Sequence, residues 1–203
     1  MRRHAWLLAA LGLAGCVHTV ALDGDLHPAN PIPNKSVEAV GVVCSPALLS
    51  HTAHGWSGLV AWEFQAGQSL CSGLVEATRG AYRSAETSLE PYKGQFARVI
   101  KYDLERSSLD FESQPDGSTR VVYGVEVIVE KYSRDLRLES RNVVVGNSLV
   151  DGNSGTREEC VQRAAAGALQ EVVDKTTGFL VAGLGNLPRQ HSQHKSRKQT
   201  SKR

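Results

Sequence analysis

The sequence predicts an α+β fold: a two-layer sandwich in which a mostly antiparallel sheet of about five strands carries two helices on one face. Two apolar stripes with helical spacing, at residues 70–85 and 161–180, flank three segments between residues 99 and 150 that alternate in polarity. Two shorter strand-like segments precede the first stripe. Alternating strands leave one face of a sheet in water, so the helices are expected to cover the other face.

The first half of the chain is predicted to contain two strands and one helix. Residues 37–44 are rich in valine and stop at a Ser-Pro pair, and residues 59–64 carry Trp62 and Phe64. Residues 47–58 between these two strands are predicted to be a loop, and the strands could pair as a hairpin. A helix follows the turn at 67–69, and its apolar positions keep the 3.6-residue period (Leu70, Cys71, Leu74, Val75, Thr78, Ala81, Tyr82 and Ala85).

The second half is predicted to be a three-stranded meander followed by a helix. Residues 99–105, 120–132 and 136–150 form the strands, and a Pro-Asp-Gly turn separates the first two. Thr156 and Glu159 have the spacing of a capping box, which predicts that a helix starts there. Its apolar stripe runs to Leu180, and glycines end it (Gly183 and Gly185).

The composition predicts one acidic globular domain over residues 37–187. The chain is 41% hydrophobic and 22% charged, which is ordinary for a globular protein. Of its 23 basic residues, six lie in the tail 188–203 and two in residues 1–15. This leaves 15 basic against all 21 acidic residues, a net charge of −6, so nucleic-acid binding is not expected. The basic tail lacks apolar anchors and is predicted to be disordered.

Residues 1–15 have the pattern of a secretory signal peptide. Arg2 and Arg3 precede an apolar run that is too short for a membrane span, which needs about 20 residues. The run ends in Leu13-Ala14-Gly15-Cys16, which resembles the lipobox of bacterial lipoproteins. That resemblance implies a diacylglyceryl thioether on Cys16, cleavage before Cys16, and acylation, for example with palmitate, of the new amino terminus. The alternative is an ordinary signal peptide with a chance cysteine.

Residues 16–36 are predicted to be a lipidated cysteine followed by a proline-rich tether. Pro28, Pro31 and Pro33 extend such a segment, which would hold the domain away from the membrane. Val17 follows the cysteine in place of the aspartate that retains enteric lipoproteins in the inner membrane. By this resemblance the protein is expected at the outer membrane, anchored by lipid and facing the periplasm.

No catalytic or metal-binding constellation is found, and no cofactor is predicted. His51 and His54 lie three residues apart, but zinc needs three or four ligands. Ser57 lies between glycines without the strand–turn–helix context of a nucleophile elbow. Trp56 and Trp62 are interpreted as core and rim packing, or alternatively as a binding edge for a partner.

The order of these elements, between residues 37 and 182, resembles three groups of bacterial envelope proteins. They are small lipoproteins of lipopolysaccharide assembly, accessory lipoproteins of secretion machines, and the amino-terminal domain of the Tol-Pal translocation protein. The resemblance implies a non-enzymatic structural or assembly partner in the cell envelope. The alternative is an envelope hydrolase or ligand-binding lipoprotein that uses the loop around His51, His54 and Ser57.

A disulfide is predicted between Cys71 and Cys160. With Cys16 carrying lipid, three thiols remain in an oxidising compartment, which allows one bridge. Each helix should run back along the sheet, so both helices are expected to point the same way with their first turns at the same end. Cys44, at the end of the first strand, is expected at the opposite edge. The alternative is three buried free thiols.

Overall fold

A computed structural model describes residues 16–22, 25–30 and 32–185. The predicted signal peptide, residues 1–15, and the predicted basic tail, residues 188–203, lie outside the described residues. Within the described part of the chain, no helix is long and apolar enough to cross a membrane.

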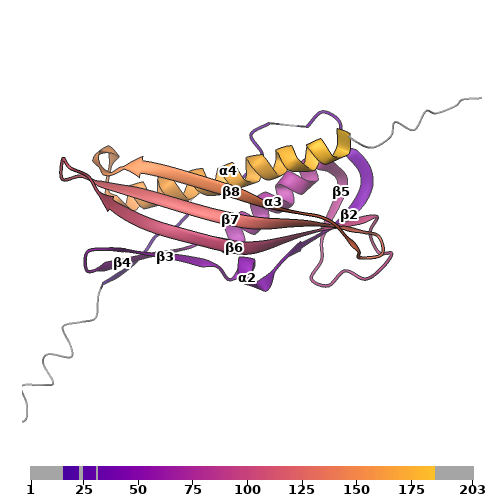
Figure 1. Cartoon of the computed structure of the whole chain (residues 1–203), viewed down its shortest axis with the longest axis horizontal. Coiled ribbons are helices and arrows are strands. Elements are labelled where there is room, and N and C mark those ends of the chain that lie inside the picture. Colours follow the sequence, from indigo (N-terminus) through magenta and orange to yellow (C-terminus); the bar gives the residue numbers. More distant parts are fainter. Residues whose placement is uncertain (1–15, 23–24, 31, 186–203) are drawn as a thin grey trace, which may run out of the picture.

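The larger of two sheets has five strands in the order β5-β2-β6-β7-β8. Its three long strands, β6 (Arg98–Ser113), β7 (Thr119–Ser133) and β8 (Leu138–Asp151), pair antiparallel as the predicted meander (Figure 1). In contrast, β2 (Ser36–Cys44) pairs in parallel with both β6 and β5 (Tyr82–Thr87). The sheet is therefore mixed: its long ladders are antiparallel, as predicted, whereas crossovers connect β2 to parallel neighbours.

A second sheet of three strands has the order β1-β4-β3. β3 (Thr52–Ser57) and β4 (Val60–Gln65) form a hairpin, and β1 (Val17–Thr19) pairs in parallel with β4. The predicted strand 59–64 is thus present, but it pairs with β3 and not with β2. The expected loop 47–58 contains β3 and part of the short helix α2, Pro46–Leu49.

The hairpin packs closely against the second half of β6. A Cβ atom added to Gly55 would lie 2.4 Å from the carbonyl oxygen of Leu109. The ring of Phe64 meets that of Tyr123 edge to face, with centroids 5.0 Å apart. Because Leu109 and Tyr123 are register partners on β6 and β7, their side chains point to the same face of the large sheet, and the small sheet rests there.

Two long helices run along the large sheet (Figure 1). α3 (Gly67–Ala81) ends four residues earlier than its stripe predicts, because Tyr82 is extended and starts β5 without a loop. α4 (Arg157–Gly185) begins at the predicted capping box. Its geometry is reciprocal: the Thr156 amide donates to Glu159 Oε2 at 2.8 Å, and the Glu159 amide donates to Thr156 Oγ1 at 3.2 Å.

The amino-terminal segment does not extend away from the domain as the predicted tether does. The amide of Ala29 donates to Asp174 Oδ1 at 2.8 Å, and Gln170 Nε2 donates to the carbonyl of His27 at 2.6 Å. Val20 is buried, and three partly buried apolar side chains also pack on the core (Leu22, Leu26 and Ile32). The described residues of this segment therefore lie along the two helices, where their apolar side chains pack on the core.

Contacts of this segment show that the two helices run in the same direction. Leu26 lies against Gly73 and Ile32 against Gly80, so the segment follows α3 from its middle toward its carboxyl end. On α4 it meets Gln170 before Asp174. The parallel arrangement agrees with the topology that the sequence predicts.

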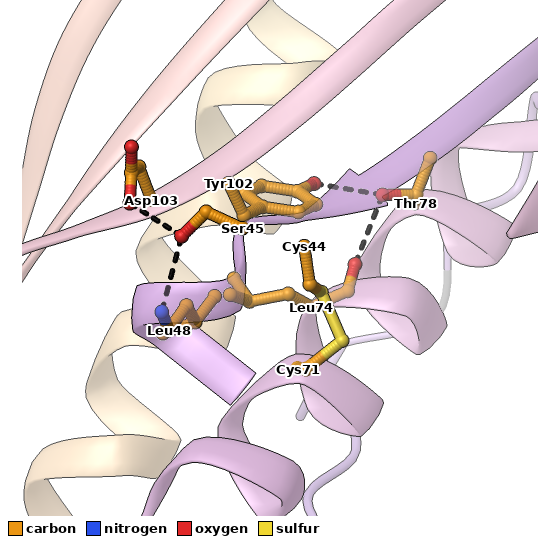
Figure 2. Close-up of a disulfide and its surroundings, with 8 residues drawn as sticks. All are labelled: Cys44, Ser45, Leu48, Cys71, Leu74, Thr78, Tyr102 and Asp103. Atoms are coloured by element: carbon orange, nitrogen blue, oxygen red, sulfur yellow. Dashed lines mark hydrogen bonds between the residues drawn. A yellow bond between two sulfur atoms is a disulfide. The ribbon is translucent and has the colours of Figure 1, made fainter. Parts of the chain in front are cut away.

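The disulfide prediction is nevertheless wrong. The structure joins Cys44 to Cys71, with Cα atoms 6.1 Å apart, and leaves Cys160 as a free, buried thiol (Figure 2). Gly73 of α3 lies against Val173 of α4. Cys160 precedes Val173 by 13 residues, about 20 Å at 1.5 Å per residue, whereas Cys71 is only two residues before Gly73. Parallel helices with staggered starts cannot bring the Cα atoms of Cys71 and Cys160 within the roughly 7 Å that a bridge needs.

Candidate functional site

The predicted lipidation residue lies directly at the edge of the small sheet. The carbonyl of Cys16 accepts a hydrogen bond of 3.0 Å from the amide of Ala61 in β4. The pairing continues through β1 to Val20, whose amide donates to the Glu63 carbonyl at 2.8 Å. Cys16 is exposed and its thiol is free. Any group attached to its sulfur is therefore held beside the sheet with no flexible spacer.

The inner face of the small sheet joins this edge to the core. The ring of His18 stacks on Trp62 with centroids 4.9 Å apart, and Trp62 lies 6.1 Å from the ring of Phe111 in β6. Trp62 and Phe64 are buried. The small sheet is thus a firm part of the domain, and the position of Cys16 is fixed relative to the large sheet.

The outer face of the small sheet consists of two rows of different chemistry. Val17, Ala61 and Trp56 are register partners across the three strands and form an apolar row. The side chains of Val17 and Trp56 are exposed, by 57% and 65%. Leu59, in the β3–β4 turn, is 87% exposed. We call Val17, Trp56 and Leu59 the apolar tip.

The second row is polar and lies two residues further along each strand. Thr19, Glu63 and His54 are its register partners. Thr19 Oγ1 donates to Glu63 Oε1 at 3.0 Å, and His54 Nδ1 lies 3.5 Å from Glu63 Oε2. The polarity of this face therefore changes within one pleat repeat, about 7 Å.

The structure does not bring His51, His54 and Ser57 together. His51 precedes β3 and Ser57 ends it, so their backbones are about 20 Å apart at 3.3 Å per residue. His54 lies in the polar row, whereas His51 Nε2 is 2.9 Å from Ser107 Oγ in β6. Burial, and to a lesser extent nearby His54, lowers the pKa of His51. This arrangement does not form the convergent site that a hydrolase or ligand pocket in this loop requires.

Among the residues that the structure describes, no group of three His, Cys, Asp or Glu side chains could hold a metal ion. An open hollow of about 640 Å³ lies beside α3 and is lined partly by Asp25, Gln68 and Arg79. It is distant in the fold from Ser57, since it lies where the amino-terminal segment meets α3.

The sequence alone does not show that Trp56 is exposed while Trp62 is buried, and it does not predict the apolar tip. Trp62 is core, as one interpretation predicts, whereas Trp56 is exposed. The tip requires β1 to pair with β4, and a three-residue strand with the sequence Val-His-Thr gives no periodic signal. The position of Trp56 could have been found only from the alternation of His54 and Trp56 with the small residues Ala53 and Gly55.

The two edges of the large sheet differ in how they are protected. At the β8 edge, the amide of Asn147 donates to Glu171 Oε2 at 2.7 Å, and Lys175 Nζ donates to the Val145 carbonyl at 2.8 Å. Glu171 and Lys175 are themselves paired at 2.7 Å. Side chains of α4 therefore occupy the backbone groups of β8 that a further strand would use. β5, at the other edge, is short and mostly exposed.

The sequence matches no protein-family model and no curated protein. The fold is similar to the crystal structure of a Xanthomonas campestris protein of the DUF330 family, which is 15% identical with a TM-score of 0.58. That match covers 83% of this chain and 97% of the other. A candidate lipoprotein from Caulobacter crescentus is 13% identical, with a TM-score of 0.44 and coverage of 68% and 93%. A minor lipoprotein from Acinetobacter baumannii is 8% identical, with a TM-score of 0.45 and coverage of 74% and 96%.

Proposed function

We propose that this chain is a lipid-anchored protein of the bacterial envelope that faces the periplasm from the outer membrane. In this role it is a non-enzymatic structural or assembly partner. The observation that carries the proposal is Cys16, which follows Leu13-Ala14-Gly15 and is exposed with a free thiol. Val17 in the next position supports the outer membrane as the destination.

The anchor is a covalent modification at two atoms of Cys16. The Cys16 thiol loses its proton and attacks the glycerol carbon of a phospholipid, which transfers its diacylglyceryl group to sulfur while the phosphate-bearing headgroup leaves. Water then hydrolyses the peptide bond between Gly15 and Cys16. The new amino group loses a proton and takes an acyl group from a phospholipid ester, which leaves as the lysophospholipid. Each buried CH₂ of an acyl chain contributes about 0.8 kcal/mol to membrane binding, and a single chain binds only reversibly. Three chains therefore hold the domain permanently.

The anchor is tested by Cys16→Ser with Cys160→Ser as the matched control. The hydroxyl cannot form the thioether, so Cys16→Ser is expected to lose labelled palmitate and to keep its signal peptide. Cys160→Ser, at a buried thiol, is expected to incorporate palmitate normally. Palmitate incorporation by the Cys16→Ser protein would contradict the anchor.

The partner role is supported by the exposed edge of the large sheet. A sheet edge with unpaired backbone groups can accept a strand from another protein. Because α4 occupies the middle of the β8 edge, we assign strand addition to β5. The segment Tyr82–Thr87 is long enough for a short ladder.

A photo-crosslinking residue at Glu86 of β5 tests this assignment in cells. Glu158, exposed in the first turn of α4, is the control position. We expect the probe at Glu86, and not the probe at Glu158, to yield a stoichiometric adduct with an envelope protein. Equal adducts at both positions, or monomer alone at both, would contradict a partner at β5.

A further inference from the structure

We propose that the apolar tip, formed by Val17, Trp56 and Leu59, inserts into the lipid surface and orients the whole domain on the membrane. This inference rests on the proposed anchor at Cys16. It goes further, because an anchor alone leaves the orientation of a domain free.

No flexible spacer separates the anchor at Cys16 from the small sheet. The Cys16 carbonyl is bonded to the Ala61 amide at 3.0 Å, and Val17 is the register partner of Ala61. Ala61 is in turn the partner of Trp56. Paired residues lie about 5 Å apart across each strand, so Trp56 is about 10 Å from Val17. Acyl chains on Cys16 must enter the bilayer next to these side chains.

The side chains of the apolar tip are exposed to solvent. Val17, Trp56 and Leu59 are exposed by 57%, 65% and 87%, although they are apolar. Tryptophan is enriched at the membrane interface because its ring is apolar and its N–H is polar. Leu59 lies beyond the strands in a turn where Gly58 has a φ of +63°. A small apolar projection of this kind fits the boundary between headgroups and acyl chains.

A polar row lies behind the apolar tip. Thr19, Glu63 and His54 contact one another about 7 Å from the apolar row. Burying Glu63 in hydrocarbon is unfavourable, so this row limits insertion to the tip. The change from apolar to polar along the sheet matches the depth profile of a bilayer interface.

A protein partner at the tip is less consistent with these contacts. A stable protein interface buries about 800 Å² on each side, and three side chains at a hairpin end provide much less. The bilayer needs no such area, because the acyl chains on Cys16 supply the affinity and the tip supplies only the orientation.

The chain offers a convenient fluorescent probe of insertion. Its three tryptophans are Trp6, Trp56 and Trp62. Cleavage before Cys16 removes Trp6, and Trp62 is buried, so Trp56 is the exposed tryptophan of the mature protein. The full lipidated protein is placed in vesicles of phosphatidylethanolamine and phosphatidylglycerol whose acyl chains carry bromine, which quenches nearby indoles.

The comparison variant moves the exposed tryptophan to the other end of the domain. In Trp56→Phe/Leu89→Trp, the new indole lies in the loop before β6, where Leu89 is 87% exposed. The Ser88 amide, next to Leu89, donates to the Val42 carbonyl, and Val42 is the register partner of Ile100 in β6. Phe111, beside the small sheet, is 11 residues further along β6, about 36 Å at 3.3 Å per residue. Both substitutions are at exposed positions, so the fold is expected to be retained.

Both proteins keep the buried Trp62, whose emission is a background common to the two. Above that background, we expect brominated vesicles to quench most of the Trp56 emission and to leave the emission of the indole introduced by Leu89→Trp unchanged. Protein that sediments with vesicles but keeps its full Trp56 emission would overturn the inserted tip while leaving the anchor intact. Equal quenching in the two proteins would also overturn it. Protein that carries no lipid and does not sediment would overturn the anchor and this inference together.

Discussion

The hydroxyl groups of Tyr102 and Thr78 lie 2.7 Å apart where β6 meets α3 (Figure 2). Thr78 Oγ1 already donates to the Leu74 carbonyl at 2.9 Å, so Tyr102 is the donor in this pair. Burial raises the pKa of Tyr102, which keeps its hydroxyl protonated. Both side chains are fully buried. The pair therefore links β6, the central strand of the large sheet, to α3.

Removing the two halves of this pair is predicted to have unequal effects on stability. Tyr102→Phe loses one hydrogen bond and should lower the free energy of unfolding by about 1 kcal/mol. Thr78→Val leaves the Tyr102 hydroxyl buried without an acceptor and should cost more, up to about 3 kcal/mol. Urea denaturation of both single variants and the double variant measures the coupling. A cost for Thr78→Val no larger than that for Tyr102→Phe would contradict this reading of the donor.

Two glycines in the α4 region are predicted to respond in opposite directions to alanine. A Cβ on Gly146 of β8 would lie 2.1 Å from the Ala168 carbonyl oxygen, a backbone atom that cannot move alone. Gly146→Ala should therefore cost about 1–3 kcal/mol. Gly178 is an exposed α4 glycine with nothing within 4 Å of its Cβ position, so Gly178→Ala should stabilise by up to about 1 kcal/mol. Thermal unfolding of both variants checks this, and stabilisation by Gly146→Ala would contradict the close approach.

Strong periodic patterns in the sequence predicted the parts of the fold that packing alone dictates. The alternation of Val121, Tyr123, Val125, Val127 and Val129 places β7 correctly, and all five are buried. The capping box at Thr156 and Glu159 fixes the start of α4. Each of these elements buries one continuous face, so the spacing of its apolar residues predicts where the element lies in the sequence.

The elements that were missed depend on contacts between distant segments. β3 packs so closely on β6 that its inward positions are Ala53 and Gly55, which give no hydrophobic signal. β1 and β5 are short, and their sequences are polar because one side remains in water. The candidate site depends on β1 and β3, so Cys16 could be found from the sequence whereas its neighbours at the tip could not.

The half-buried histidine just before β3, His51, is predicted to make the fold sensitive to acid. Burial lowers the pKa of His51 below its ordinary value of about 6.5, so the unfolded chain binds its proton more readily. The stabilising contribution is present above pH 6.5 and is lost as the pH falls below that value. His51→Gln should therefore lose less stability than the wild type between pH 7.5 and pH 5.5. Denaturation at both pH values measures this.

His54→Gln is the matched control for this pH dependence. The His54 side chain is 62% exposed, and it contributes less than burial to the lowered pKa of His51, so its replacement should remove only the smaller part of the acid-induced loss. An equal reduction of the loss in the two variants would show that burial of His51 is not its source.

The bridge between Cys44 and Cys71 is predicted to be a major source of stability. It closes a loop with a sequence separation of 27, for which the loss of chain entropy in the unfolded state corresponds to about 3.5 kcal/mol. The bridge fastens the end of β2 to the first half of α3, next to the Tyr102–Thr78 pair (Figure 2). Cys44→Ser/Cys71→Ser should therefore unfold at a clearly lower urea concentration than the wild type.

Reductant and peptide mapping separate this bridge from other pairings. Dithiothreitol should lower the unfolding midpoint of the wild type and leave that of the double variant unchanged. Non-reducing peptide mapping of the mature protein should link the Cys44 and Cys71 peptides and find Cys160 as a free thiol. Cys160→Ala, which removes the remaining thiol of the domain, should keep the full sensitivity to reductant. A Cys160 peptide linked to the Cys71 peptide would contradict the bridge, because α4 would then have to start level with α3. A wild-type midpoint that reductant does not move would also contradict it.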